Sequence, residues 1–325
     1  MSEHCMETLE ALLADVPAET ILLPGHSSCS LLMEEWRAQT DGRGRIDSLT
    51  LYPGITLAWN YYLAQRVRIT HKANPRVLEI NHCRSGRSGW AMEGGLSLYL
   101  GPGDLTLHMT DCCAHTEMSF PLGFYEGITI SVDLDALTHF GPELLREAGI
   151  SGELISSRFS PQSLPLAMPA NEEIRHIFSE LYTLPEAIRI PYCKLKVQEL
   201  LLFLSTQKIS DRQRLTPYPP EQIHRIEEIH TLLTEHLDCR YTIEELSRRY
   251  LINTSSLKEI FKSVYGLPIA SYMKEYRMHE AMRLLRETDD SIASIASAVG
   301  YESQGKFAKA FKDAVHLSPT QYRKQ

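Results

Sequence analysis

The sequence predicts an α+β fold, in which a β-barrel with flanking helices precedes an all-helical domain that contains two helix-turn-helix units. Three observations support this prediction. A pattern of helix caps and apolar residues occurs twice in the last third of the chain. Short strand-like runs, separated by turn residues, fill the region from about residue 47 to residue 133. A polar and then proline-rich stretch lies between these two parts.

The length and composition fit a globular protein with two domains. The chain has 325 residues, of which 43% are hydrophobic and 23% are charged. No run of about 18 apolar residues occurs, so we expect no transmembrane helix and no membrane partner. The first residues lack the features of a secretory signal, and the seven cysteines show no regular spacing. We therefore expect reduced thiols and a cytoplasmic location.

The excess negative charge lies outside the C-terminal third. The net charge is −8, whereas residues 220–325 carry 15 basic and 15 acidic side chains. The total charge argues against general, charge-driven binding to nucleic acid. Screening limits such effects to about 10 Å, however, so local charge matters more. Residues 303–312 contain three lysines and no acid, which gives this short segment a basic surface.

We expect four segments along the chain. They are an N-terminal helical arm (1–45), a ligand-sensing β-barrel with a helical closing or dimerisation segment (46–205), a linker (206–219) and a double helix-turn-helix domain (220–325). Within the arm, Met6–Leu13 and Ser30–Trp36 have helix-forming composition. Pro220 suits the first turn of the helix that follows the linker.

Five strands are predicted in the second segment. They are Ile55–Tyr62, Val77–Cys83, Leu96–Leu100, Leu105–Met109 and Tyr125–Val132. Turn residues separate them at Arg84–Arg87, Glu93–Gly95 and Gly101–Asp104. Closely spaced strands of this kind indicate a barrel or a double-sheet, cupin-like jelly roll.

Helical patterns resume at Leu134 and again at Asn171–Leu181 and Ile190–Ser205. The last of these has a wide apolar face, formed by Leu195, Leu200, Leu201, Phe203 and Leu204. This face could close the barrel or pair with the same helix of a second subunit. We therefore expect a homodimer.

The repeated pattern runs from Thr242 to Pro268 and again from Ser291 to Pro319. Phe261 and Phe311 hold equivalent positions in the two copies. Each copy predicts a short helix, a tight turn and a second helix. This layout places one helix in the major groove of DNA.

The first copy begins at Thr242, which forms a predicted capping box with Glu245. Asn253 then caps the first candidate recognition helix, residues 254–264, and Leu257 and Phe261 point inward. The outward-facing residues are Ser255, Ser256, Lys258, Glu259 and Lys262.

The second copy follows the same plan. Ser291 caps its first helix, Gly300 permits the turn and Ser303 caps the second recognition helix, which Phe307 and Phe311 anchor. The outward-facing residues are Gln304, Gly305, Lys306, Lys309 and Lys312. A glutamine can bond to a base edge, whereas lysines suit phosphate or guanine.

One continuous helix, Pro268–Arg286, is predicted between the two copies. At ~1.5 Å per residue its length is ~28 Å, and successive major grooves lie ~34 Å apart. The two recognition helices are therefore expected to lie side by side at about one groove interval and to bind double-stranded promoter DNA.

The segment Tyr241–Arg323 resembles the DNA-binding domain of the AraC/XylS family of transcription regulators. The matching residues are Phe261-Lys262, Gly266, Tyr272, Arg277, Ala281, Leu284-Leu285, Ile292–Ala296, Val299–Tyr301, Phe307, Phe311-Lys312, Ser318-Pro319 and Tyr322-Arg323. The N-terminal half is similar to the ligand-sensing barrels of this family through Asn81–Arg87, Gly101–Asp104, Phe120-Pro121 and Tyr125–Gly127. Together with Lys194–Leu201, these segments resemble the ferric-siderophore regulator branch.

The resemblance implies two DNA-contacting units, a small-molecule effector and RNA polymerase as a further candidate partner. It implies no cofactor and no catalytic residue. Family members often carry Arg at the position of Glu259 and Ser at that of Gly305. An acid at residue 259 repels phosphate, although it could accept a hydrogen bond from a cytosine amine. We therefore expect the second unit to contribute more to DNA binding.

Candidate effector-binding residues come from the aromatic and imidazole side chains of the predicted strands: Trp59, Tyr61, His82, Trp90, Tyr99 and His108. Each aromatic residue could equally be plain barrel core. A metal or redox sensor is an alternative, because His82, Cys83, His108, Cys112, Cys113 and His115 lie in or near the strands. Their spacing fits no common zinc motif, so we expect no metal ligands. A metal-dependent barrel enzyme is a further alternative, although no compact H-x-H with a following Glu occurs.

Overall fold

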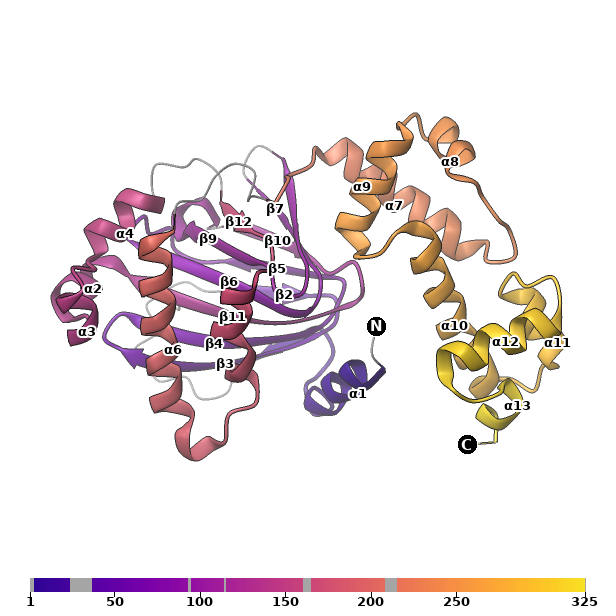
Figure 1. Cartoon of the computed structure of the whole chain (residues 1–325), viewed down its shortest axis with the longest axis horizontal. Helices are drawn as coiled ribbons and strands as arrows, with labels where there is room; N and C mark the ends of the chain where they lie inside the picture. Colours follow the sequence, from indigo (N-terminus) through magenta and orange to yellow (C-terminus); the bar gives the residue numbers. More distant parts are fainter. Residues whose placement is uncertain are drawn as a thin grey trace. The chain divides into compact units, whose positions relative to one another are not determined.

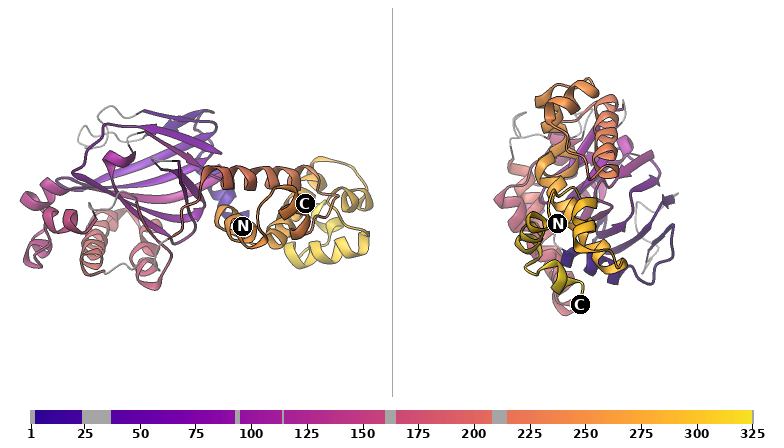
Figure 2. Two further views of the ribbon diagram at one scale, coloured as in Figure 1. Left: turned by 90° about the horizontal axis from the view of Figure 1, so that it is seen from above. Right: turned by 90° about the vertical axis from the view of Figure 1, so that its right-hand side faces the viewer.

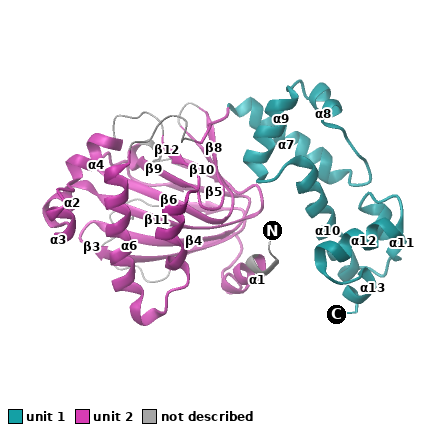
Figure 3. Ribbon diagram, viewed as in Figure 1, with its two compact units in different colours: residues 1, 219–325 teal, residues 2–218 magenta. Residues whose placement is uncertain are grey.

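The computed structural model describes residues 3–23, 37–92, 95–113, 115–159, 165–207 and 215–324. The chain divides into two compact units between Tyr218 and Pro219 (Figure 3). No helix in these described ranges combines the length and apolar character needed to cross a bilayer.

The N-terminal unit begins with helix α1 (Glu3–Leu12) and strand β1 (Thr20–Leu22), and then enters the sheets with β2 (Arg37–Thr40) and β3 (Arg43–Tyr52). The predicted helical arm over residues 1–45 is therefore only partly correct, because three strands begin within it. The helix predicted at Ser30–Trp36 lies outside the described residues.

Two β-sheets form the body of this unit (Figure 1). The larger has seven strands in the order β1-β3-β4-β11-β6-β9-β12, and the smaller has five in the order β2-β5-β10-β7-β8. The strands not yet given are β4 (Ile55–Leu63), β5 (Arg66–Thr70), β6 (Val77–Gly86), β7 (Ser88–Ala91), β8 (Ser97–Leu100), β9 (Leu105–Met109), β10 (His115–Ser119), β11 (Phe124–Asp133) and β12 (Leu166–Met168). Of the two expected arrangements, a barrel or a double-sheet jelly roll, the structure has two separate sheets.

All five predicted strands are present, at β4, β6, β8, β9 and β11. The turn at Gly101–Asp104 is also present, since Asp104 N donates to Gly101 O at 3.0 Å and Gly103 has φ 88°. The turn predicted at Arg84–Arg87 is mostly strand, because β6 continues to Gly86. Residues 93–94 of the remaining turn lie outside the described residues.

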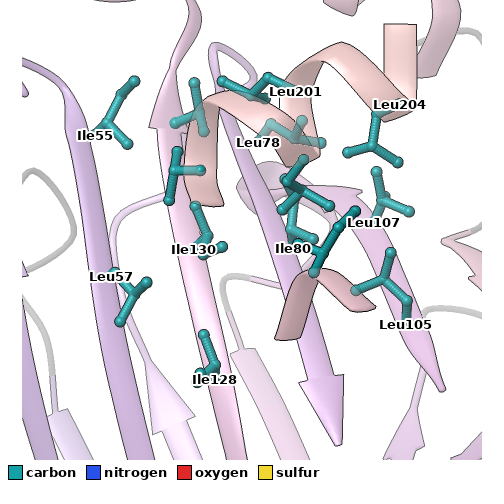
Figure 4. Close-up of a cluster of buried hydrophobic side chains, with 14 of the residues drawn as sticks. Ile55, Leu57, Leu78, Ile80, Leu105, Leu107, Ile128, Ile130, Leu201 and Leu204 are labelled. Atoms are coloured by element: carbon teal, nitrogen blue, oxygen red, sulfur yellow. The ribbon is translucent and has the colours of Figure 1, made fainter. Parts of the chain in front are cut away.

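Helices cover one face of the seven-stranded sheet (Figure 2). They are α2 (Leu134–Phe140), α3 (Glu143–Glu147), α4 (Gly152–Phe159), α5 (Glu172–Phe178), the 3-10 turn η2 (Ser179–Tyr182) and α6 (Glu186–Thr206); a further 3-10 turn, η1 (Thr110–Cys113), follows β9. Leu200, Leu201 and Leu204 of α6 are fully buried against this face. Figure 4 shows Leu201 and Leu204 beside Leu78 and Leu107 of the sheet.

Strand alternation divides each strand between two environments. Along β4, Ile55, Leu57 and Trp59 belong to the cluster under the helices. Thr56 and Asn60 point the other way, into the space between the sheets. One face of the seven-stranded sheet is therefore a hydrophobic helix-docking surface, and the opposite face is more polar.

The C-terminal unit is all-helical (Figure 1). Its helices are α7 (Pro220–Glu235), α8 (Ile243–Arg249), α9 (Thr254–Tyr265), α10 (Ile269–Glu287), α11 (Ile292–Ala298), α12 (Gln304–Val315) and α13 (Pro319–Tyr322). The two predicted helix-turn-helix units are α8–α9 and α11–α12. The predicted connecting helix is α10, with 19 residues.

The predicted caps account for the helix starts in both copies. Thr242 accepts from Glu245 N while Glu245 caps the Thr242 backbone, which completes the capping box. The side chains of Asn253, Ser291 and Ser303 cap α9, α11 and α12. These local interactions fix where each helix begins, independently of its packing.

Buried aromatic residues hold the recognition helices in place. Phe261 of α9 and Phe307 and Phe311 of α12 are fully buried. Phe307 and Phe311 pack in one cluster with Leu285 of α10 and Ile295 of α11. Fixing one face of each recognition helix in this way leaves its opposite face for solvent.

Candidate functional site

The outward face of α9 carries small polar and charged residues. Ser255, Lys258, Glu259 and Lys262 are exposed, and Ser256 is partly exposed. The inward positions Leu257, Ile260, Phe261 and Val264 are buried. This surface can contact phosphates and base edges, although Glu259 reduces its positive charge.

The outward face of α12 is more basic. Gln304, Gly305, Lys306, Lys309 and Lys312 are all exposed. A Cβ atom added at Gly305 would meet no atom within 4 Å, so the first turn of α12 is open at this position. The helix therefore presents three lysines and one amide side chain without obstruction from its own unit.

One of these lysines already has a partner. Lys306 Nζ lies 2.5 Å from Glu302 Oε2, and both side chains are 69% exposed. The hydrogen bond from Lys306 lowers the pKa of Glu302. A phosphate that approaches Lys306 must compete with this carboxylate.

Each unit turns sharply before its recognition helix. Leu251 in the first unit and Gly300 in the second follow the C-cap residue of the preceding helix, and both have a left-handed backbone. A Cβ atom at Gly300 would lie 2.1 Å from Leu237 O. Only glycine fits that close approach.

A cavity of about 160 Å³ lies between the two sheets of the N-terminal unit. Side chains from β3, β4, β6, β9 and β11 line one side of it, and side chains from β5, β7, β8 and β10 line the other. Its walls are mainly apolar, with several hydroxyl, amide and imidazole groups. Ligand pockets in other proteins have walls of this composition.

A hydrogen-bonded pair of an imidazole and a carboxylate lies on the wall of this cavity. His108 Nε2 of β9 is 3.1 Å from Glu79 Oε2 of β6, and the two residues are direct cross-strand neighbours. Burial alone would raise the pKa of Glu79, but the hydrogen bond from His108 and the nearby His71 give a net lowering. Glu79 is therefore ionised at neutral pH.

A short chain of hydrogen bonds lies beside this pair. Asn60 Nδ2 donates to Thr129 Oγ1 at 2.9 Å, and Thr129 Oγ1 donates to Asn81 Oδ1 at 2.7 Å. All three residues line the cavity. This chain holds their side chains in fixed orientations and so pre-forms that part of the wall.

The cavity contains two of the six candidate effector-binding residues, Trp90 and His108. Their rings lie 4.3 Å apart between centroids. Tyr99 is buried in β8 and does not line the cavity. Its placement there is explained by strand alternation, because the neighbouring Leu100 takes the inward position.

The remaining three candidates lie on the opposite face of the sheet. Trp59 Nε1 donates to Leu181 O at 3.0 Å, and Tyr61 packs on the same cluster under the helices. The ring of His82 stacks on Phe178 at 4.1 Å, and its Nδ1 is 2.9 Å from Tyr182 Oη. Their assignment to the cavity was wrong, because it used residue type without strand parity.

The residues proposed for a metal or redox sensor are also divided. His82 and His108 lie on opposite faces of the sheet, and Cys83 is buried in a different cluster. Within the described ranges, no three His, Cys, Asp or Glu side chains gather closely enough to hold a metal ion. The side chains of Cys112, Cys113 and His115 are outside the described part of the structure.

Several residues that line the cavity were not predicted from the sequence, above all Glu79, Asn81 and Thr106. The alternation of polar and apolar residues along the strand could have identified the first two. In Val77–Cys83, the acid and the amide alternate with Leu78 and Ile80, which marks them as the opposite face.

Comparisons with known proteins match the C-terminal region. Residues 246–325 match the family model described as a helix-turn-helix domain. The chain is 28% identical over 127 residues to the transcriptional activator RhaR of Mannheimia succiniciproducens, which covers 39% of this chain and 44% of that protein. It is 34% identical over 85 residues to the transcriptional regulator MtrA of Neisseria gonorrhoeae, covering 26% and 28% respectively. The chain thus spans less than half of the length of these relatives.

A solved structure also matches in this region. It is the C-terminal domain of AraT, a response regulator from Geobacillus stearothermophilus, with 29% identity and a TM-score of 0.29. The match covers 31% of this chain and 84% of that domain.

Proposed function

We propose that this chain is a ligand-responsive, sequence-specific DNA-binding transcription regulator of the AraC type, because its C-terminal region matches a helix-turn-helix domain model and a relative named a transcriptional activator. A small molecule in the N-terminal cavity alters promoter binding or activation by the C-terminal unit. The protein acts in the cytoplasm and has no catalytic role, in keeping with relatives that are named transcription regulators. RNA polymerase is a further partner, since one relative is named an activator.

One observation carries this proposal: two helix-turn-helix units occur in one compact unit and are joined by α10. The 19 residues of α10 give a length of ~28 Å, close to the ~34 Å between successive major grooves. The exposed faces of α9 and α12 carry the candidate DNA contacts. The more basic α12 is proposed to make the larger contribution.

The sensing role is supported by the cavity between the sheets. This cavity lies in a unit with its own hydrophobic core. A small molecule can therefore enter or leave the cavity without unfolding the DNA-binding unit. The linker after α6 is the covalent connection through which the change is transmitted.

We also propose that the protein is a homodimer that pairs through α6. One face of this helix is buried on the sheet, whereas Ile188 and Leu195 are 47% and 64% exposed. These two residues are seven positions apart and therefore share one face. Replacing Leu195 with Glu should shift the mass measured by light scattering from dimer to monomer. A monomeric wild-type protein would contradict the dimer but not the DNA-binding assignment.

The DNA-binding proposal is tested with the full chain and the promoter fragment next to its own gene. Fluorescence anisotropy should show tighter binding to this fragment than to a scrambled fragment of equal length. Affinity should fall steeply with salt, because phosphate contacts release counterions. Absence of a preference for any promoter fragment would overturn the proposal.

A further inference from the structure

The cavity between the sheets carries information about its ligand, and this inference rests on the proposed sensing role. The described residues that line it include one acid, Glu79, and no Lys or Arg. The two imidazoles that face the acid, His71 and His108, are both on the cavity wall. The described lining therefore contains one carboxylate and no permanently cationic side chain. A ligand with a negative charge would meet Glu79 without a cation to balance it.

Unsatisfied hydrogen-bonding atoms lie beside this acid. Thr106 is 1% exposed and His108 is 7% exposed. Thr106 Oγ1 and His108 Nδ1 have no hydrogen-bond partner in the described structure. Buried polar atoms without partners are rare and costly, so a ligand that bonds to them recovers this free energy.

Both unsatisfied atoms can accept a hydrogen bond. His108 Nε2 faces the carboxylate and donates to it, so Nδ1 of a neutral imidazole is an acceptor. His108 approaches Oε2 of Glu79, and within the described ranges no hydrogen bond to Oε1 is found. The hydroxyl oxygen of Thr106 can accept as well. Three acceptors on neighbouring strands match the three donors of a primary ammonium group.

The rest of the wall suits an apolar body of limited size. Ile69, Trp90, Leu100 and Met118 contribute apolar side chains to the cavity. Its volume is about 160 Å³. An engineered cavity of about 150 Å³ in another protein holds benzene. This cavity therefore accepts a single ring or a short chain, and it has no room for a ferric siderophore.

We propose that the effector is a small primary amine, positively charged at neutral pH, whose ammonium group bonds to Glu79 and whose body is one ring or a chain of about six carbons. Thr106 and His108 accept its remaining N–H groups. The apolar walls exclude water from the ion pair, which strengthens the electrostatic attraction. This assignment excludes carboxylates and phosphates as effectors.

The test uses the full-length protein and probes that differ only in charge. The ring series is 2-phenylethylamine, 2-phenylethanol and phenylacetate, and the chain series is hexylamine, hexanol and hexanoate. In each series, isothermal titration calorimetry should show binding of the amine at least about tenfold tighter than binding of the alcohol, and no binding of the carboxylate.

Two nearly isosteric variants locate the interaction. Glu79→Gln should weaken amine binding by at least about tenfold, and Thr106→Val should weaken it by a smaller factor. Glu180→Gln, an exposed acid of η2, is the matched control and should bind like the wild type. The melting temperature of each unliganded variant shows whether it is folded. If Glu79→Gln does not fold, the result for Thr106→Val decides.

Tighter binding of either carboxylate or either alcohol than of its matching amine would overturn the proposal, as would failure of both amines to bind. Each of these results would leave DNA binding by the same preparation intact. Loss of promoter binding, by contrast, would contradict the regulator assignment itself. The two failures are therefore distinguishable.

Discussion

Leu251 and Gly300 occupy equivalent turn positions in the two helix-turn-helix units, and both have a left-handed backbone, with φ of 52° and 78°. This conformation is easy for glycine but costs other residues roughly 1–2 kcal/mol. Leu251 is also 82% exposed, so its side chain contributes little burial in compensation. The turn of the first unit therefore contains strain that the turn of the second unit avoids.

Replacing Leu251 with Gly should raise the unfolding free energy of the C-terminal unit by roughly 1 kcal/mol, because the strain is removed and few contacts are lost. Urea unfolding followed by circular dichroism measures the change. The reciprocal change, Gly300→Ala, should destabilise by more than about 2 kcal/mol, since the new Cβ would meet the Leu237 carbonyl oxygen. If both changes shifted the unfolding free energy in the same direction, the two turn positions would not be equivalent.

Lys309 should contact a phosphate or guanine, because it is exposed in the middle of the basic face of α12. Lys309→Ala should weaken promoter binding and reduce the slope of log affinity against log salt by about 1. Anisotropy titrations at several salt concentrations provide both values. Lys72→Ala, an exposed lysine of the other unit, is the control and should leave the slope unchanged. Unchanged binding by Lys309→Ala would remove this residue from the interface.

Neutralising Glu302 should have the opposite effect. Its carboxylate holds Lys306 at 2.5 Å and lies next to the face proposed to meet phosphate. Glu302→Gln should therefore tighten promoter binding, both by freeing Lys306 and by removing a repulsive charge. The gain should shrink at high salt. If the double variant Glu302→Gln/Lys306→Ala binds as tightly as Glu302→Gln, then Lys306 makes no contact with DNA.

The C-terminal unit was largely predictable because its signals are local. Caps such as Thr242 and Ser303 mark helix starts within a few residues, and the repeat of Phe261 at Phe311 fixes the register of the two copies. The exposed and buried faces of each recognition helix then follow from the helical period alone. Whether these faces contact DNA is a prediction that the experiments above address.

The N-terminal unit was less predictable because sheets are built from distant segments. The five recognised strands are the strongly apolar ones, whereas the short β5 was missed although Arg66 and Arg68 alternate with its apolar residues, a pattern that itself indicates a strand. The cavity depends on pairing: Glu79 meets His108 only because β6 and β9 are neighbours in the sheet. No spacing in the sequence indicates that pairing, so residue type alone misplaced Trp59 and His82.

His230 makes the C-terminal unit sensitive to acid. Its ring stacks on Tyr265 at 4.3 Å, and its Nε2 is 2.9 Å from Tyr272 Oη. Burial lowers the pKa of His230 from 6.5 to about 4. In the unfolded chain the pKa returns to about 6.5, so below that pH the unfolded state binds the additional proton. Stability is therefore fully present above about pH 6.5 and is lost as the pH falls towards 4.

The expected loss over this pH range is on the order of 3 kcal/mol, at about 1.36 kcal/mol per pH unit. Urea unfolding at a series of pH values measures it in the full chain. All three tryptophans lie in residues 2–218, so tryptophan fluorescence reports unfolding of the N-terminal unit alone. The helical circular dichroism signal also reports unfolding of the all-helical C-terminal unit. This separation is needed because burial also lowers the pKa of His82 in the N-terminal unit to about 4.

His230→Phe keeps an aromatic ring against Tyr265 but cannot bind a proton, so it should flatten the pH dependence of the C-terminal transition. Its absolute stability will also change, because Tyr272 loses a hydrogen-bond partner. The slope is therefore the decisive quantity. His224→Gln, on the same helix but 71% exposed, should keep the wild-type slope. A wild-type slope in His230→Phe would mean that another group causes the acid sensitivity of this unit.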